Sequence, residues 1–267
     1  MKDKMKCPIS GNPMIPAFSE TVLGKHRVQY YYCEECCLLK TEAPYWLDEA
    51  YQTIGDTDTG LVGRNIANSK MAEVILELLS IAKGKFVDVA GGYGLLTRLM
   101  RDKGFDCYTT DKYFQNLFAI SFEPTVDFKA DALFAFEVLE HIEDPLIFLK
   151  TIFNQYGCKT LIFSTLTFAN TIPSRDWWYY SFEAGQHITF YQQSTLSLLA
   201  KRLECKYWMV NPSLHIFTDI DISHIRRLMF FNKYFRMLYS IYIRLRRKGL
   251  SKTWDDHLQM KNLLKNR

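Results

Sequence analysis

The chain lacks an apolar run of about 18 residues, the length of a helix that crosses a bilayer, so we expect no membrane-spanning helix. It also lacks an apolar stretch behind the basic N-terminal residues Met1–Lys6, so this end does not read as a signal peptide. The 267 residues are 48% hydrophobic and 15% aromatic. That length and composition suit one full α/β domain with one or two small additions.

The excess of positive charge is small overall, +4, but it is unevenly distributed. The residues from Ile222 onward carry 12 basic and two acidic side chains, a net charge of +10, whereas the rest of the chain carries 21 basic and 27 acidic ones, a net charge of −6. Arginines interleaved with aromatic and aliphatic residues over Ile222–Gly249 predict one or two basic helices. Such helices pack on the domain, lie at a membrane surface or contact nucleic acid. No base-recognition motif favours nucleic acid.

The N-terminal cysteines lack one member of a zinc-ribbon pattern. A ribbon uses two C-x-x-C pairs, and Cys33-Glu-Glu-Cys36 is complete, but Cys7 is followed by Ser10 where its partner belongs. Candidate zinc ligands are Cys7, Cys33, Cys36 and Cys37, with His26 as another candidate for the fourth place. The alternative is a degenerate ribbon that keeps its shape without metal. Clustered cysteines with no secretion signal favour a reducing, cytoplasmic compartment.

A glycine-rich turn between a buried strand and a helix is the central feature of the chain. The strand Phe86–Val89 contains Asp88, the turn contains Gly91, Gly92 and Gly94, and an apolar-striped helix starts at Leu95. Glycines let the backbone approach a ligand, and the helix start offers free N–H groups. A second strand, Phe105–Asp111, ends in an acid placed to accept ribose hydroxyls. The pattern predicts an adenosine-containing cofactor.

The turn lacks the G-x-G-x-x-G spacing of dinucleotide-binding folds. Asp88-Val-Ala-Gly-Gly-Tyr-Gly94 instead resembles the D-x-G-x-G-x-G turn of class I S-adenosyl-L-methionine-dependent methyltransferases, with Ala90 in place of the first glycine. The block Glu137-Val-Leu-Glu-His141, with Asp144-Pro145 after it, resembles the block that follows the fourth strand of that superfamily. The resemblance covers about half the chain and implies a Rossmann-like α/β fold. The cofactor-binding residues it implies are Asp88, Ala90, Gly91, Gly92, Gly94, Asp111, Phe136 and Glu137.

Three functional interpretations of Glu137–His141 stay open beside a purely structural histidine. The segment lines the cofactor or substrate, His141 acts as a general base, or Glu137, Glu140 and His141 hold a divalent ion. The last follows from a resemblance to the E-x-x-E-H of some ubiquinone-pathway O-methyltransferases.

A long aromatic loop follows the fifth strand and predicts the substrate-binding region, because such loops at strand ends recognise ligands in α/β enzymes. Its candidate substrate-binding residues are Arg175, Trp177, Trp178, Tyr179 and Tyr180. Aromatic rings suit a sugar or planar ring, and Arg175 suits a phosphate or carboxylate.

Gln186-His187-Ile-Thr-Phe-Tyr191 resembles the E-H-x-x-Y-F block of sugar methyltransferases, some of which also carry an N-terminal cysteine ribbon. The resemblance implies that His187 is the catalytic base. Gln186 stands where the family has an acid, and Glu183 is the candidate substitute. The alternative is a structural histidine at 187.

Together these features predict a class I methyltransferase domain with a small N-terminal zinc-ribbon-like segment and a helical C-terminal extension. The expected segments are 1–45 (ribbon), 46–84 (helical connection covering the cofactor site), 85–218 (methyltransferase domain) and 219–267 (basic extension). The predicted activity is transfer of a methyl group to a small sugar-containing acceptor, in nucleotide-sugar metabolism or surface-polysaccharide biosynthesis. The rivals are an RNA methyltransferase with a zinc ribbon and a non-catalytic binding module. A membrane-attached form would lie on the inner face of the membrane.

Overall fold

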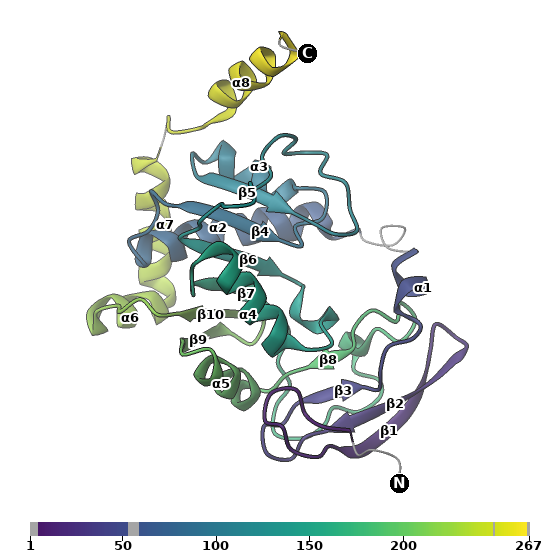
Figure 1. The fold of residues 1–267 in the computed structure, drawn as a ribbon. Coiled ribbons are helices and arrows are strands. Elements are labelled where there is room, and N and C mark those ends of the chain that lie inside the picture. The colour runs from purple at the N-terminus through teal and green to yellow at the C-terminus, as the bar shows by residue number, and fades with distance from the viewer. Residues whose placement is uncertain (1–4, 53–58, 248, 266–267) are drawn as a thin grey trace. The chain divides into compact units, whose positions relative to one another are not determined.

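The computed structural model describes residues 5–52, 59–247 and 249–265. They form two compact units, each built from segments that are far apart in the sequence (Figure 1). The first unit contains residues up to 58, 136–154 and 163–219, and the second contains 59–135, 155–162 and 220–267. The polar residues of 54–60 predict a loop, and the part of it over 54–58 lies outside the described residues. The four-segment division of the chain stays a prediction.

The first unit contains a four-stranded antiparallel sheet in the order β1-β2-β3-β8. Its strands are β1 (Ile15–Val22), β2 (His26–Tyr32), β3 (Leu39–Thr41) and β8 (Thr189–Phe190). β1 and β2 form a hairpin whose turn places Leu23 and Gly24 at positive φ, the conformation that tight hairpin turns require. The β-branched and aromatic residues of these strands suit a half-buried sheet. The sequence predicted β2 but not that β8, more than 140 residues later, would complete the sheet.

An aromatic core holds this sheet to the loop after β7. Tyr30, Trp46, Tyr180 and Phe190 are almost fully buried there. Tyr180 stacks on Phe182 with ring centroids 5.0 Å apart. The Trp46 indole donates a hydrogen bond to the Gly185 carbonyl at 2.8 Å, which satisfies the one polar group of a buried indole. The helices of this unit are α1 (Leu47–Gln52), η1 (Leu139–His141), α4 (Pro145–Tyr156), η2 (Trp178–Tyr180) and α5 (Gln193–Arg202), and the unit also contains two strands of the larger sheet described below.

The second unit begins with α2 (Leu61–Leu78) and continues into parallel strands. β4 (Lys85–Val89) pairs with β5 (Asp106–Thr110) on one side and β6 (Ala132–Phe136) on the other. α3 (Leu95–Asp102) connects β4 to β5. β4 and β6 are buried along almost their whole length, and β6 is wholly apolar, as expected of strands covered on both faces.

The larger sheet has the strand order β5-β4-β6-β7-β10-β9. Its last strands are β7 (Leu161–Ser164), β9 (Lys206–Asn211) and β10 (Leu214–Thr218), and the last two form an antiparallel hairpin. The chain reverses its direction of advance between β4 and β6, which is the position where doubly wound sheets bind ligands. The order and the covering helices confirm the predicted Rossmann-like α/β fold class.

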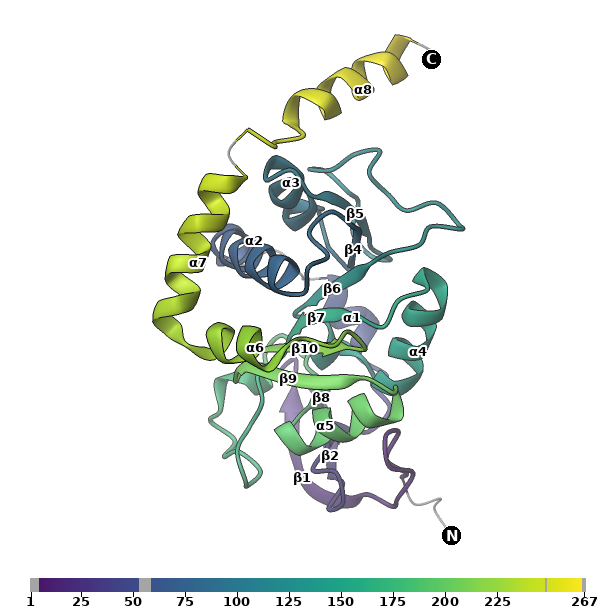
Figure 2. The ribbon, with the colours of Figure 1, turned by 90° about the vertical axis from the view of Figure 1, so that its left-hand side faces the viewer.

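Three helices end the chain: α6 (His224–Phe231), α7 (Lys233–Arg246) and α8 (Thr253–Lys265). The Asn232 side chain accepts the backbone N–H bonds of Tyr234 and Phe235 and so separates α6 from α7. Figure 2 shows α7 running beside α2. The sequence predicted the basic helices α6 and α7 within a helical extension but set no bounds for α8, which is anchored by a buried ion pair between Asp256 and Arg101 at 2.6 Å. Across the described residues, no helix combines the length and apolar character needed to cross a membrane.

Candidate active site

The glycine turn after β4 is closely constrained by its own side chains. A Cβ on Gly91 would lie 2.4 Å from both Asp88 Oδ2 and Thr109 Oγ1, so only glycine fits there. Gly92 and Gly94 have positive φ angles of 57° and 80°, which glycine adopts at little cost. Ala90, the departure from the family pattern, has a φ of 54°. The backbone therefore keeps the left-handed shape of the motif although the residue carries a Cβ.

Asp111 uses its carboxylate to hold this turn in place. Its Oδ2 accepts the Gly92 N–H at 2.8 Å, and its Oδ1 accepts the N–H groups of Tyr113 at 2.7 Å and Phe114 at 2.9 Å. A carboxylate offers about four acceptor positions, so about one remains for a ligand hydroxyl. The predicted ribose contact of Asp111 is thus compatible with a single hydrogen bond.

Two further observations fit a polar ligand at the turn. Thr109 Oγ1 is buried and finds no hydrogen-bond partner among the described residues. A Cβ built on Gly92 would meet open space, so the backbone at that point is accessible from one side. Asp88 is buried, and desolvation, with a smaller contribution from Asp111, raises its pKa to about 8. The residues of this turn therefore suit a neutral, hydrogen-bonding portion of an adenosine cofactor.

A second cluster, wholly within the first unit, brings Glu140, His141 and His187 together. Their donor atoms all lie within 4.8 Å of one another. Tyr179 connects two of them: its hydroxyl donates to Glu140 Oε1 at 2.6 Å, and its backbone carbonyl accepts from His187 Nδ1 at 2.6 Å. The His141 and His187 rings meet edge to face with centroids 5.0 Å apart.

The hydrogen bonds fix the tautomers of both histidines. A carbonyl oxygen can only accept, so the nitrogen facing it must carry the proton. His187 donates from Nδ1 to Tyr179, and His141 donates from Nδ1 to the Gln186 carbonyl at 3.0 Å. Each neutral ring therefore has its lone pair on Nε2, the atom that a general base uses.

Burial adjusts the charges of this cluster toward neutrality. It lowers the pKa of His141 to about 3, with His187 adding to the effect, and it lowers the pKa of His187. It raises the pKa of Glu140 to about 7. Glu140 Oε2 is buried and has no hydrogen-bond partner within the described part of the chain. Two neutral imidazoles thus lie beside a carboxyl group that titrates near neutral pH.

Glu183, the acid expected beside His187, does not take that place. Glu183 is exposed, and the Gln186 amide donates to the Ala50 carbonyl at 2.9 Å. Glu140 is the carboxyl group that the structure connects to His187, through Tyr179. The sequence offered Glu140 as a metal ligand or as part of a ligand-lining segment, and Tyr179 mainly as a substrate contact. Neither pairing could be found from spacing, because 39 residues separate Glu140 from Tyr179.

Glu137 and Phe136 follow β6 directly. Glu137 is exposed and has a positive φ of 55°, and its N–H donates to Ser164 Oγ at 2.7 Å. Its side chain does not belong to the group of donors formed by Glu140, His141 and His187. Phe136 is half-buried. Their predicted cofactor contacts stay predictions.

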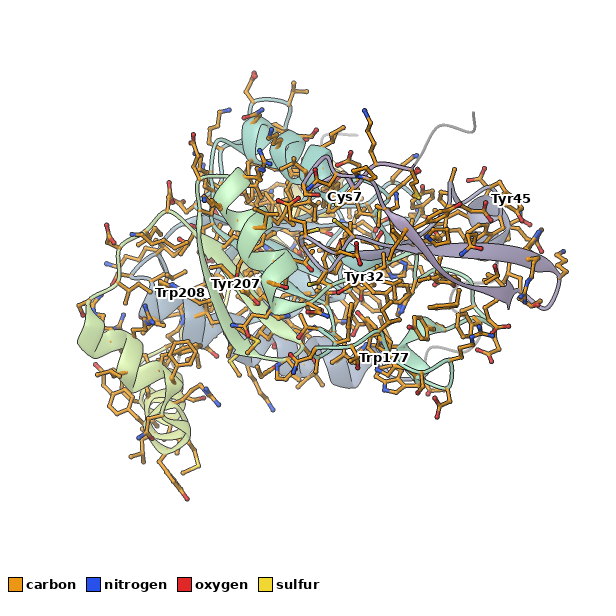
Figure 3. The ribbon with its side chains drawn as sticks, turned by 90° about the horizontal axis from the view of Figure 1, so that it is seen from below. Cys7, Tyr32, Tyr45, Trp177, Tyr207 and Trp208 are labelled. Carbon is orange, nitrogen blue, oxygen red and sulfur yellow. The ribbon has the colours of Figure 1, made fainter. Side chains whose placement is uncertain are left out.

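The predicted substrate residues divide into exposed and buried ones. Trp178 is 73% exposed, and Arg175 is exposed beside Glu20, with an N–O distance of 3.7 Å. Trp177, labelled in Figure 3, is half-buried and packs against Tyr179 and Tyr180. The Tyr180 hydroxyl donates to the Pro173 carbonyl at 3.0 Å. Trp178 and Arg175 are therefore the residues of this set that offer an open surface.

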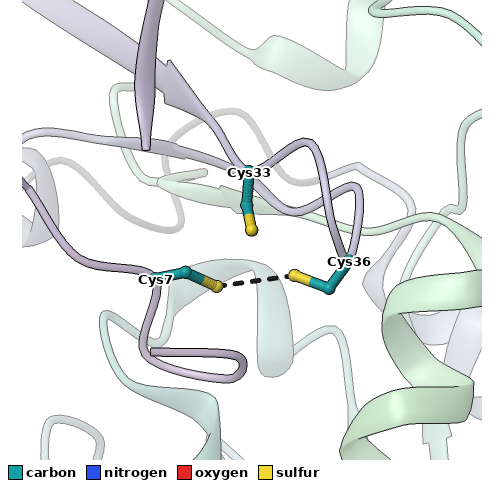
Figure 4. A group of neighbouring side chains, drawn as sticks. All are labelled: Cys7, Cys33 and Cys36. Carbon is teal, nitrogen blue, oxygen red and sulfur yellow. Dashed lines mark hydrogen bonds between the residues drawn. The ribbon is translucent and has the colours of Figure 1, made fainter. Parts of the chain in front are cut away.

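Three of the predicted zinc ligands converge in the first unit. The sulfurs of Cys7, Cys33 and Cys36 lie within 4.8 Å of one another, and those of Cys7 and Cys36 are 3.4 Å apart (Figure 4). The hydrogen bond with Cys36 lowers the pKa of the Cys7 thiol to about 5. Four sulfurs at about 2.3 Å from a tetrahedral zinc ion are about 3.8 Å apart, which is similar to this spacing.

The fourth place in this cysteine cluster is beside Ser10. Its hydroxyl lies 3.3 Å from the Cys33 sulfur, and its N–H donates to the Cys7 sulfur at 3.5 Å. Cys37 instead interacts with Tyr32, which is labelled in Figure 3. His26 pairs with Glu49 at 3.0 Å. Three thiols and a hydroxyl therefore form the donor set that the structure brings together.

The strand order, the glycine turn and the acid after β5 together define an α/β fold of the class I methyltransferase type. Residues 64–210, more than half of the chain, match the family described as methyltransferase domain. The chain belongs to this methyltransferase domain family.

Solved structures with a similar fold include three methyltransferase-related proteins. CalO1, a methyltransferase in calicheamicin biosynthesis in its SAH-bound form, has 14% sequence identity and a TM-score of 0.42, over 64% of this chain and 59% of that one. The pyocyanin biosynthetic protein PhzM has 14% identity and a TM-score of 0.47, over 64% and 60%. A possible histamine N-methyltransferase from Thermotoga maritima has 12% identity and a TM-score of 0.43, over 65% and 99%.

The aligned region thus covers about three fifths of the first two of these chains. No curated protein sequence matches this chain.

Proposed function

We propose that this protein transfers a methyl group from S-adenosylmethionine to a small acceptor, with His187 as the general base. The observation that carries the proposal is the buried Glu140–Tyr179–His187 arrangement in a chain of the methyltransferase domain family. When bound, S-adenosylmethionine supplies a methyl group activated by its sulfonium. The protein then has to orient the acceptor and take up the proton that it loses.

His187 is suited to that task by its tautomer and its surroundings. The Tyr179 carbonyl holds the proton on Nδ1, so Nε2 accepts the acceptor's proton. The lowered pKa keeps the ring neutral at pH 7, and Glu140 supplies negative charge that offsets the imidazolium formed on proton uptake. Tyr179 is a positioning residue, because it holds His187 in place and does not itself take up the acceptor's proton.

The glycine turn after β4 would hold the adenosine portion of the cofactor. Asp111 would accept one ribose hydroxyl while it keeps the turn closed, and the N–H groups of Gly92 and the start of α3 would face the ligand. Ala90, Gly91 and Gly94 would shape the turn, and Asp88 and Thr109 would offer polar atoms. Phe136 and Glu137 are proposed to contact the methionine portion.

A sugar-containing acceptor is supported by the character of the substrate loop. Trp178 presents an exposed aromatic ring, on which a sugar or planar ring can stack, and Arg175 presents a guanidinium suited to a phosphate or carboxylate. These two side chains favour an anionic glycoside, such as a nucleotide sugar, as the substrate class. We propose a role for the protein in surface-polysaccharide biosynthesis on the basis of this acceptor class alone.

The decisive test is turnover and cofactor binding in His187→Ala. We expect turnover to fall by about 10²- to 10⁴-fold, the usual contribution of a general base, with the Kd for S-adenosylmethionine within about twofold of the unaltered protein. His257→Ala is the matched control, because His257 is exposed on α8. Acceptors would be screened with labelled cofactor against nucleotide sugars, glycans and RNA. Full turnover in His187→Ala would remove the base assignment.

The same screen separates the rival functions. Preferential labelling of RNA, with binding that weakens steeply as salt rises, would support an RNA methyltransferase. Failure of S-adenosylmethionine to bind in calorimetry would support a non-catalytic module.

A divalent ion is the second candidate for Glu140, His141 and His187. The close spacing of these donors and the unpartnered Glu140 Oε2 favour it. Dialysis against a chelator followed by addition of metal distinguishes the two: if the cluster needs the ion, lost activity returns with Mg²⁺ or Mn²⁺, whereas with His187 as a base these ions leave the activity unchanged.

For the cysteine cluster we propose a structural zinc ion held by Cys7, Cys33 and Cys36, with a water or Ser10 in the fourth place. Elemental analysis of purified protein should give about one equivalent of zinc, and Cys33→Ser should reduce it strongly. Cys205→Ser, which changes a half-buried cysteine outside the cluster, should leave the zinc content unchanged. Well below one equivalent in the unaltered protein would remove the metal.

A further inference from the structure

Two adjoining cavities lie between α2 and the helices α6 and α7, entirely within the second unit. The first has a volume of about 750 Å³ and the second about 550 Å³. Val74 and Arg236 contribute to the walls of both. Neither cavity includes a residue of the glycine turn or of the histidine cluster, so the proposed methyl transfer leaves them unexplained.

The first cavity is basic and partly aromatic. Its charged lining residues are Lys83, Arg226, Arg236 and Arg246, opposed by Glu77 and Asp131. Glu77 is already shared by Arg246 at 3.3 Å and Arg247 at 3.2 Å. Positive charge therefore exceeds negative charge around this space. Guanidinium groups beside Phe230, Phe235 and Tyr239 form a setting suited to a phosphate ester.

The second cavity is mainly apolar. Ile66, Met71, Val74 and Met237 contribute to its lining, with Lys70 and Arg236 as its basic residues. A basic space that adjoins an apolar one fits a ligand with an anionic head and a hydrocarbon tail.

Along α7, beside the opening of the second cavity and beyond it, several apolar side chains are exposed, and Met237 and Tyr234 among them also line that cavity. Tyr234, Met237, Leu238, Ile241 and Leu245 recur at intervals of three and four residues, the spacing of one helix face. Leu245 is 69% exposed and Leu238 61%. Arg227 and Arg246 are exposed on the same helical segment, α6 to α7. An apolar face with basic neighbours is the pattern of a helix that lies in a membrane interface.

We propose that α6 and α7 dock the protein on an anionic membrane surface, with a lipid phosphate in the arginine-lined cavity and its hydrocarbon chain along the apolar one. The net charge of +10 in this part of the sequence attracts an anionic leaflet. In this proposal the helices attach to the surface without crossing it, since no helix among the residues that the structure describes is long and apolar enough to cross. The proposal is independent of the methyl acceptor. A second copy of this chain is the competing occupant of the face.

Flotation of the full-length protein with vesicles tests the proposal. We expect binding to phosphatidylcholine vesicles that contain phosphatidylglycerol, weak binding to phosphatidylcholine alone, and loss of binding in about 1 M salt, where the Debye length is about 3 Å. Leu238→Glu combined with Ile241→Glu should weaken binding at least about tenfold, because two apolar side chains no longer enter the interface. Arg226→Ala should weaken binding to anionic vesicles about fivefold.

Val126→Glu is the matched control, since it places the same charge at a residue that is 92% exposed between β5 and β6, and it should bind like the unaltered protein. Thermal melting of each variant verifies folding, and if the double variant fails to fold, Arg226→Ala decides. Absence of vesicle binding would overturn the proposal, as would equal binding to neutral vesicles. Release by glycerol phosphate alone would identify a soluble phosphate ligand instead. Dimers that Leu238→Glu dissociates, without lipid binding, would assign the face to a second copy.

Discussion

The glycine turn of the second unit and the histidine cluster of the first unit are built in opposite ways. The turn consists mostly of backbone: Asp88 to Gly94 are consecutive, and their positions are set by φ angles and by the absence of Cβ atoms. The cluster consists of side chains from two distant segments, 139–141 and 179–187, connected by hydrogen bonds to Tyr179.

This difference explains which region can be read from the sequence. A site made by backbone needs particular residue types at fixed short spacing, so it leaves a motif. A site made by side chains requires only that the fold bring them together. The same difference predicts which changes affect each site. Added side-chain volume should perturb the turn, whereas loss of a hydrogen bond or a change of pH should perturb the cluster.

The largest effect is expected for Gly91→Ala. The new Cβ would lie 2.4 Å from Asp88 Oδ2 and Thr109 Oγ1, so the turn must shift. We expect a loss of about 1–3 kcal/mol in unfolding free energy, as in other overpacked sites, and a loss of S-adenosylmethionine binding. Denaturant unfolding and calorimetry measure the two. Gly63→Ala, a helical site where a Cβ meets nothing within 4 Å, is the control. Normal cofactor affinity in Gly91→Ala would contradict the assigned role of the turn.

In the histidine cluster, Tyr179→Phe removes one hydroxyl and leaves the ring. Glu140 Oε1 and the Leu166 N–H then lose a partner, and the expected cost is about 1–3 kcal/mol of unfolding free energy. Turnover should fall about tenfold with KM nearly unchanged, because Tyr179 positions and tunes the base without touching the acceptor's proton. Tyr180→Phe, which loses only a bond to the Pro173 carbonyl, is the matched control. A rise in KM alone would make Tyr179 a substrate-binding residue.

The pH dependence of stability should distinguish Glu140 from the histidines. Burial lowers the pKa of His141 to about 3 and that of His215 to about 4, so both stabilise the fold above pH 6.5 and lose that contribution as pH falls. The pKa of Glu140 is raised from 4.5 to about 7, so this group acts in the opposite sense. Its contribution to the stability of the fold is lost as pH rises from 4.5 to 7.

Glu140→Gln removes the carboxyl group whose titration opposes that of the histidines. Between pH 4.5 and 6.5, the unfolding free energy of this variant should therefore rise more steeply with pH than that of the unaltered protein, by up to about 1.4 kcal/mol per pH unit. Urea unfolding at a series of pH values measures both slopes, with the exposed Glu183→Gln as control. Equal slopes would mean that Glu140 is ionised throughout this range.

The smallest effect is expected for Ala90→Gly, which restores the family pattern. Relief of the left-handed strain at a φ of 54° gains about 1–2 kcal/mol, and the added freedom of glycine in the unfolded chain costs about 0.4–1 kcal/mol. The net stabilisation should be about 1 kcal/mol or less in denaturant unfolding. Gly94→Ala at a φ of 80° should act in the opposite direction. Destabilisation by Ala90→Gly would show that the Cβ of Ala90 makes favourable contacts.

Secondary structure near the turn was predictable because periodicity reports burial. The strands over Lys85–Val89 and Ala132–Phe136, the helix α2 and the basic helices α6 and α7 all carry apolar patterns that show in the sequence. The bounds of the C-terminal helix α8 were not predicted, since its anchorage depends on contacts with distant residues, among them Asp256 with Arg101 and Arg98. The pairing of β3 with β8 was also missed, because a two-residue strand leaves no periodic signal.

In the candidate site, the sequence indicated the residue types but not their partners. His187 was singled out as the catalytic base, which stays a prediction; Glu183 was expected beside it, whereas the structure connects Glu140 to it through Tyr179. Among the cysteines, the three thiols gather, but Ser10 lies in the place considered for Cys37 or His26. In both sites the partner of a residue depends on how distant loops and strands pack together, and the residues next to it in the sequence do not specify that packing.

By itself, the sequence determined the Rossmann-like fold class, the methyltransferase family and the glycine turn, because these depend on hydrophobic periodicity and on short-range steric rules. Only the tertiary structure decided that Tyr179 joins Glu140 to His187, that both histidines are neutral with Nε2 as the lone-pair atom, and that α2 and α7 enclose a basic and an apolar cavity. Those features arise from burial and hydrogen bonds between residues that are tens to hundreds of positions apart, which no local pattern encodes.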